Sequence, residues 1–179
     1  MANNAENTMN AFTSVLYKLP DDTDLSIFTD ITVEVPEGST DYGYFSEDGE
    51  VYSQSPSITK VKAHQNNDVV RTLVSDADHT LAVNFIEDTP AVRNLYYANV
   101  EDGSGKTIVN PYKVSHGKFY YSASDTAEGF EKTTVYVFEA DVTPNGDITY
   151  AAGDNLVNYP VLFTFVGDVI KLSSVPTES

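Results

Sequence analysis

The stretch from residue 42 to residue 97 decides the fold, and it contains Tyr42-Gly43-Tyr44-Phe45-Ser46-Glu47-Asp48-Gly49, Asp68-Val69-Val70-Arg71-Thr72-Leu73-Val74 and Leu81-Ala82-Val83-Asn84-Phe85-Ile86. Three polar residues end the aromatic run of the first segment, and Gly49 supplies the positive φ that a tight reversal needs. The first segment therefore predicts a turn between two strands. In the last segment, apolar residues at every second position predict a strand with one buried face.

A change of sequence period follows this strand. Thr89 can cap a helix, and Pro90 fits the first helical position. Val92, Leu95 and Tyr96 then lie on one face, at the i, i+3 and i+4 spacing of a helix. The sequence predicts one short helix, at about residues 90–98.

Strand patterns dominate the rest of the chain. Residues 31–35 alternate, residues 58–63 are extended and half polar, and residues 133–138 are β-branched and aromatic on both faces, as in a covered central strand. His116-Gly117 and Asn145-Gly146 resemble the turns of two hairpins. We therefore expect a mainly β, antiparallel protein, a β-sandwich or partly closed barrel with one flanking helix.

The two ends of the chain show no sustained period. Residues 1–25 are rich in asparagine and acids, and they fit equally an extended arm lying on a neighbouring subunit and simple terminal disorder. Residues 173–179 are expected to be a flexible tail. No repeat or low-complexity linker divides the chain, so residues 1–179 are expected to form a single domain.

Composition excludes several classes of protein. The 179 residues are 41% hydrophobic and 12% aromatic, which is too apolar for a wholly disordered chain. They include no cysteine, so the chain has no disulfide, thiolate metal site or cysteine nucleophile. No apolar run is long enough for a membrane span, and the N-terminus lacks the pattern of a signal peptide. We expect a soluble protein that is made in the cytoplasm and does not bind membranes.

Net charge is the second strong signal. The chain carries 27 acidic and 10 basic side chains, a formal charge of −17. High affinity for nucleic acid depends on lysine and arginine neutralising phosphates, so this class of partner is excluded. The acidity either serves solubility alone or forms a wall that DNA passes without sticking. The candidate acids for such a wall or surface are Glu47, Asp48, Glu50, Asp68, Asp76 and Asp78.

Several short motifs, in this order, resemble the major tail protein of siphophages, the subunit of the tail tube. They are the polar start Met1–Asn7, the Gly43-Tyr44 and Ser46 to Gly49 turn, the Val69-Val70-Arg71 strand start, the Tyr96-Tyr97 pair and the strand Asn158–Phe165. The chain departs from the family at His64, where the family often has tryptophan, and over residues 20–40.

This resemblance implies a structural virion protein with no enzymatic activity and no cofactor. Its copies would form six-membered rings, each subunit lending strands to a common barrel, and the rings would stack into a channel for DNA ejection. The implied partners are other copies of the chain, the tape measure protein, the tail terminator and the distal tail proteins. The implied location is the virion tail, after synthesis in the host cytoplasm.

The resemblance favours the arm reading of residues 1–25, and it makes a hairpin over residues 106–121 the second candidate assembly surface. Arg71, one of two arginines, either pairs with a carboxylate and fixes assembly geometry or forms a weak exposed ion pair. The candidate assembly contacts are Asn3, Asn4, Phe12, Tyr17, Arg71, Lys106, Lys113, His116 and Tyr120.

Motifs for catalysis or ligand binding are incomplete. Residues 103–107 resemble a phosphate-binding loop, but they lack its first glycine and the helix that should follow. The three histidines have no zinc spacing, and residues 141–154 miss the spacing of a calcium-binding EF-hand loop. The main alternative is an extracellular β-sandwich module that binds carbohydrate or another surface ligand. Such a module would be expected to carry a signal peptide and often exposed tryptophan, and the chain contains no tryptophan.

Overall fold

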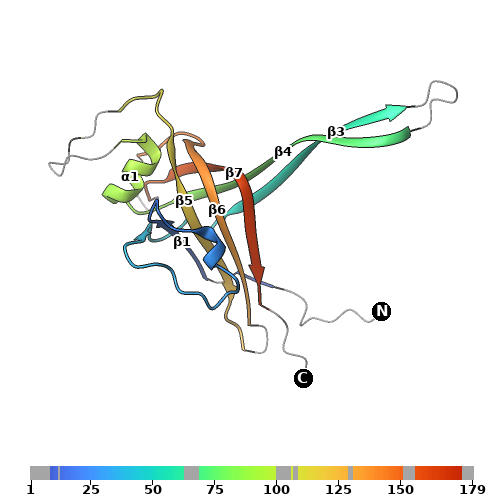
Figure 1. Ribbon diagram of the computed structural model, residues 1–179. Helices are drawn as coiled ribbons and strands as arrows, with labels where there is room; N and C mark the ends of the chain where they lie inside the picture. Colours follow the sequence, from blue (N-terminus) through green and yellow to red (C-terminus); the bar gives the residue numbers. More distant parts are fainter. Residues whose placement is uncertain are drawn as a thin grey trace.

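The computed structural model describes residues 9–11, 13–62, 69–99, 106, 109–128, 131–150 and 156–174. Its strands are β1 (Thr13–Leu19), β2 (Thr40–Asp41), β3 (Val51–Lys62), β4 (Val69–Phe85), β5 (Ser115–Asp125), β6 (Lys132–Pro144) and β7 (Tyr159–Ser173), and its helices are the 3-10 helix η2 (Leu25–Ile27) and α1 (Pro90–Tyr97). The strands form one antiparallel sheet in the order β2-β1-β5-β6-β7-β4-β3 (Figure 1). The prediction of a mainly β, antiparallel protein is confirmed. The sheet is open, with β2 and β3 at its edges.

Apolar side chains cover both faces of the middle of this sheet. On one face, rings of β5, β6 and β7, including Phe119, Phe138 and Phe163, pack with Val92 and Leu95 of α1. On the other face, Val135 and Val137 pack beneath the segment between β1 and β2. Residues on successive positions of β6 are therefore buried on opposite faces, which confirms the prediction of a central, covered strand over residues 133–138.

The stretch that opened the sequence analysis behaves largely as predicted. The Gly49 amide donates to the Ser46 carbonyl at 3.1 Å, and Gly49 has a φ of 77°, so the turn is confirmed. Leu81, Val83 and Phe85 are buried in β4 as expected. The predicted helix is also confirmed, because the Thr89 hydroxyl accepts a hydrogen bond from the Val92 amide at 3.3 Å and Pro90 is the first residue of α1.

Gly43 is required by both backbone and packing. Its φ is 77°, and a methyl group there would lie on the carboxyl group of Glu87, which accepts a hydrogen bond from the Tyr44 amide at 3.2 Å. Gly49 has the same φ but open space around it. A comparison of substitutions at the two glycines therefore distinguishes the cost of backbone strain from the cost of a steric collision.

We expect Gly49→Ala to lower the free energy of unfolding by about 1 to 2 kcal/mol through left-handed strain alone. Gly43→Ala should cost about 1 kcal/mol more, because Glu87 must move and its hydrogen bond is lost. Urea denaturation of both variants measures the difference. In a Glu87→Ala background, where the hydrogen bond and the collision are both absent, adding Gly43→Ala should cost only the strain, and equal losses in the two single variants would contradict the argument.

Residues 31–35 do not form the strand that was predicted. The side chain of Asp30 accepts a hydrogen bond from the Thr32 amide at 2.7 Å and turns the chain there. Ile31, Val33 and Val35 instead pack against the cluster around Val135 and Val137. Their alternation belongs to an irregular segment that covers a sheet, not to a strand.

His116-Gly117 is not a turn, so the predicted hairpin over residues 106–121 is wrong. Both residues lie inside β5, paired with Asp141 and Ala140 of β6. A methyl group on Gly117 would meet the Cε atom of Lys18 at 2.9 Å, so this glycine permits close packing against β1.

The two-residue hairpin predicted at Asn145-Gly146 is also wrong. β6 ends at Pro144 and β7 begins at Tyr159, so a longer connection joins them. Val142 pairs with Phe163, and Ile148 lies outside the strands.

The predicted arm over residues 1–25 is contradicted for residues 13–19, which form β1. This strand lies between β2 and β5, and its Leu16 and Leu19 are buried. Residues 1–8 and Phe12 lie outside the described residues, as do residues 175–179 of the expected tail, while Ser173 ends β7.

The most conspicuous feature is a two-stranded ribbon. Residues 80–85 of β4 pair with β7, whereas residues 69–79 have β3 as their single partner among the described strands, and the two strands project away from the body (Figure 1). The register shifts twice, between Ser57 and Ile58 and between Val61 and Lys62. At each shift β4 holds one more residue than β3. The prediction of an extended segment at residues 58–63 is confirmed as far as Lys62.

Candidate assembly surfaces

The outer half of the ribbon, residues 58–62 and 69–74, exposes apolar side chains on both faces. Ile58 and Val74 are cross-strand partners with 54% and 61% of their surfaces exposed. Leu73 and Val61 are exposed on the opposite face by the alternation of the strands. Among the described residues this half has no packing partner, and a ribbon of two strands without a covered face is only marginally stable in water.

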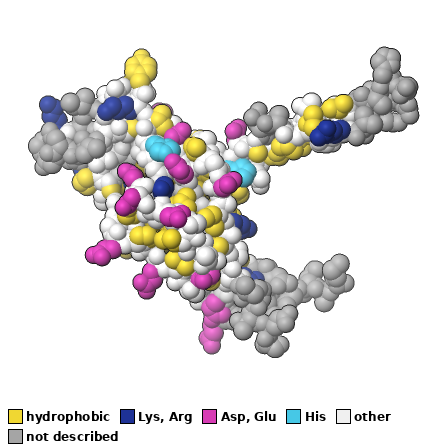
Figure 2. Space-filling view, viewed as in Figure 1, with side chains coloured by type: hydrophobic (Ala, Val, Ile, Leu, Met, Phe, Trp, Pro, Cys, Tyr) yellow, Lys and Arg dark blue, Asp and Glu magenta, His cyan; other side chains and the backbone are white. Residues whose placement is uncertain are grey.

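The outer half of the ribbon differs from the body in charge. It contains Lys60, Lys62 and Arg71 and no acid, whereas the whole chain carries −17. Figure 2 shows most acidic side chains on the body and one at the base of the ribbon, and apolar and basic side chains along its outer part. The outer half of the ribbon is therefore opposite in charge to the chain as a whole, which makes it electrostatically complementary to the body of a second copy.

Arg71 has no carboxylate within ion-pair distance among the described residues. The carboxylate partner predicted for Arg71 from the sequence therefore stays a prediction. Arg93 does have one. Its guanidinium lies 2.6 Å from the Asp88 carboxylate, which also accepts a hydrogen bond from the Tyr159 hydroxyl at 2.8 Å. The hydrogen bond from Arg93 holds the pKa of Asp88 below its usual value. Arg93 thus stabilises the start of α1 within one chain.

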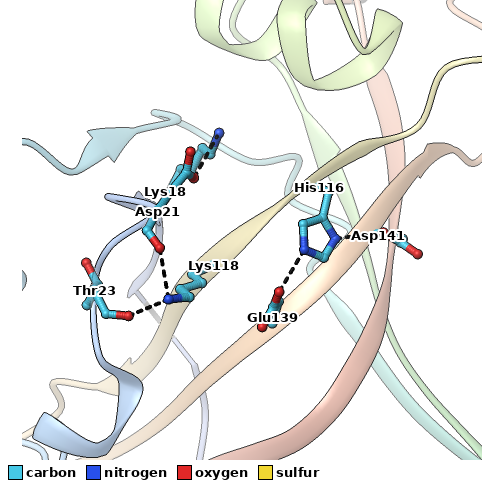
Figure 3. A network of polar contacts seen from close by, with 7 residues as sticks. All are labelled: Lys18, Asp21, Thr23, His116, Lys118, Glu139 and Asp141. Carbon is cyan, nitrogen blue, oxygen red and sulfur yellow. Dashed lines mark hydrogen bonds and ion pairs between the residues drawn. The ribbon is translucent and has the colours of Figure 1, made fainter.

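A second polar cluster lies on β5 and β6 (Figure 3). The His116 ring places Nδ1 2.8 Å from the Asp141 carboxylate and Nε2 2.7 Å from the Glu139 carboxylate. All three side chains are about half exposed. The hydrogen bond to Asp141, followed by that to Glu139, raises the pKa of His116 above its usual value.

Lys118, two residues along β5, serves a different purpose. Its ammonium group donates to the backbone carbonyls of Asp21 at 2.9 Å and Thr23 at 2.6 Å (Figure 3). These bonds attach the segment after β1 to the sheet. Lys18 lies 4.0 Å from the Asp21 carboxylate, an exposed pair of small energetic value.

The structure disperses the other predicted assembly contacts. Tyr120 is buried with Phe28 in the second core cluster, so its prediction as a surface contact is wrong for this chain. Tyr17 is half-buried beside Tyr120, and Lys113 donates to the Asn99 side chain at 3.1 Å. Lys106 is exposed, and its neighbours in the sequence lie outside the described residues. Asn3 and Asn4 lie outside the described residues.

The predicted acids also separate. Glu47 and Asp48 are exposed in the turn, and Asp78 is exposed on β4. Glu50 is not free, because its carboxylate accepts hydrogen bonds from the Ser14 hydroxyl at 2.8 Å and the Tyr121 hydroxyl at 3.0 Å. It therefore stabilises the join between the turn and the sheet. Asp68 and the side chain of Asp76 lie outside the described residues.

Sequence reasoning missed Glu139 and Asp141, which are the partners of His116. Their spacing of two residues in a strand places them on one face, a signal that was present in the sequence. It does not show that His116 pairs with them, because the predicted hairpin over residues 106–121 places a turn at His116-Gly117.

No group of three histidine, cysteine or acidic side chains within the described part of the chain has an arrangement suited to a metal ion. Most of the phosphate-loop-like segment and Asp154 lie outside that part. No helix in the described ranges is long and apolar enough to cross a membrane.

The sequence was compared with known families and with curated proteins. A scan against models of protein families matches none of them, and a search of curated proteins finds no match.

Proposed function

We propose that this chain is a self-assembling structural subunit of a phage tail tube, whose copies join into stacked six-membered rings around a channel for DNA. The resemblance of its sequence motifs to the major tail protein of siphophages suggests the class. The single structural observation that supports the proposal most strongly is the projecting ribbon, with exposed apolar side chains on both faces.

An uncovered apolar ribbon favours a protein partner. Isolated apolar side chains are ordinary on protein surfaces, but here Ile58, Val61, Leu73 and Val74 lie together on ten or so residues of two paired strands. A surface of this kind becomes stable when another molecule packs against it.

Charge favours a second copy as that partner. The outer half of the ribbon is basic and the chain as a whole is strongly acidic, so the outer half in one copy is attracted to the body of another copy. Attraction between these parts offsets the repulsion between two chains of like net charge. The complementarity also favours contact of the ribbon with a body over contact between two ribbons.

The open sheet provides a second means of joining copies. β3 is a long edge strand, and soluble proteins pair or cover such edges to avoid uncontrolled association. Pairing of edges around a ring would close the sheets of all copies into a common barrel, which is the barrel element of the proposed fold.

The acidic surface suits the passage of DNA. Six copies would carry six times the formal charge of −17, and a channel wall with a good share of this charge repels phosphates. DNA would slide through such a channel without binding. A channel lined with lysine and arginine would contradict this part of the proposal.

Purified protein tests the assembly directly. Sedimentation velocity over a concentration series should show growth from monomer to large species, and negative-stain images should show rings or tubes with a hollow centre. A chain that stays monomeric at the highest concentration would contradict the proposal. Binding of a glycan by that monomer would instead support the alternative of a carbohydrate-binding module.

A further inference from the structure

We propose that His116, Glu139 and Asp141 form a proton-operated clamp, which joins the start of β5 to β6 while the imidazole is protonated and loosens when it loses its proton. This device is separate from the proposed assembly and would operate in a single copy. It rests on the geometry of one side chain placed between two carboxylates.

Both nitrogens of His116 face an acceptor. Nδ1 lies 2.8 Å from an oxygen of Asp141, and Nε2 lies 2.7 Å from an oxygen of Glu139. An ionised carboxylate accepts hydrogen bonds and cannot donate them, and a neutral imidazole has one donor and one acceptor. Neutral His116 can therefore satisfy one carboxylate and must turn a lone pair toward the other. The two contacts together require the imidazolium ion.

The backbone brings the three groups together. His116 and Asp141 are direct cross-strand partners, and Glu139 lies two residues from Asp141 on the same face of β6. Without a cation between them, these two carboxylates would face each other along one strand. The protonated ring removes that repulsion as it forms two charge-assisted hydrogen bonds.

The described residues around the ring supply no substitute cation. On β5, Lys118 is bonded to the carbonyls of Asp21 and Thr23. On the neighbouring strand β7, the partners of Glu139 and Asp141 are the uncharged Val166 and Thr164. Among the described residues, the charged groups in contact with the ring are thus the two carboxylates, and Lys118 is the nearest basic residue along β5 (Figure 3).

The sign of the pH dependence follows from linkage. The carboxylates raise the pKa of His116 in the folded chain, so the clamp contributes all of its stability below the ordinary histidine value of about 6.5. That contribution is lost as pH rises through the higher, folded value. Because the three groups are about half exposed, solvent screening limits the effect to that of a surface ion pair.

Titration of the imidazole CH resonances by NMR, in buffer with EDTA so that no metal competes with the proton, tests the clamp. The signal that disappears in His116→Gln should titrate above the ordinary histidine value, and it should move toward that value in the double variant Glu139→Gln/Asp141→Asn. A His116 signal at or below the ordinary value in the wild-type chain would overturn the proposal.

Unfolding in urea gives the second readout. Between about pH 6 and about pH 8.5 the wild type should lose stability relative to His116→Gln, by up to about fivefold in the equilibrium constant for unfolding. His79→Gln is the matched control, since it removes an imidazole that packs against Tyr52 on another strand pair, and the difference between wild type and His116→Gln should persist when it is added to both. Amide protection factors at residues 115–118 should fall over the same range. A constant ratio between wild type and His116→Gln, with unchanged protection, would overturn the clamp.

Discussion

Replacing Ile58 and Val74 together with threonine is expected to weaken self-association at least tenfold. The two side chains are cross-strand partners, more than half exposed, and on one face of the ribbon. Burial of a large aliphatic side chain contributes about 1.5 to 3 kcal/mol, and threonine retains only part of that. Loss of about 1.4 kcal/mol in total is already a factor of ten in affinity. Threonine keeps the β-branched shape that favours a strand, so the ribbon itself should still form.

The measurement is sedimentation velocity over a concentration series, with circular dichroism to show that the sheet is retained. Ile27→Thr is the matched control, because Ile27 is a similarly exposed isoleucine in η2, away from the ribbon. It should associate like the wild type. If the ribbon variant assembled at wild-type concentrations, the ribbon would not be an assembly surface.

Phe163→Ala is expected to cause the largest loss of stability, about 3 to 5 kcal/mol in the free energy of unfolding. Phe163 is fully buried in β7, and its ring lies 4.9 Å from that of Phe119 and 6.2 Å from that of Phe138. Its removal leaves a cavity between β5, β6 and β7, the three central strands. Urea denaturation at neutral pH measures the change.

Two variants of β7 calibrate this result. Phe163→Leu keeps most of the buried volume and should cost clearly less than alanine. Val166→Thr changes an exposed residue of the same strand and should cost about 0.5 kcal/mol or less. A small loss in Phe163→Ala would mean that the core around Phe119 is not closely packed.

Sequence patterns predicted the elements whose causes are local. The helix α1 needed only Thr89, Pro90 and the spacing of Val92 and Leu95, all of which lie within one segment. The buried face of β4 was also predictable, because the alternation of apolar residues from Leu81 to Phe85 indicates a strand with one buried face. Strand β6 followed from its β-branched and aromatic run.

The wrong predictions have a common physical cause. In each of them, tertiary contacts stabilise a structure other than the one that the local sequence pattern indicates. The alternation at residues 31–35 serves to cover Val135 and Val137 without a strand. Gly117 marks a close approach of Lys18, which cannot be told from a turn glycine by sequence alone. In the candidate site, His116 and its two acidic partners are 23 and 25 residues apart, and only the register of β5 with β6 brings them together.

The register shifts of the ribbon determine where it points. An extra residue in one strand of a pair increases the local twist and bends the strand. Ser75 is the extra residue of β4 at the point where the outer half begins. Its deletion would leave the apolar and basic side chains of the ribbon almost unchanged while altering the direction in which they are presented. The length of β3 and β4 thus determines how far the ribbon extends from the body, and single inserted residues determine the direction in which it extends.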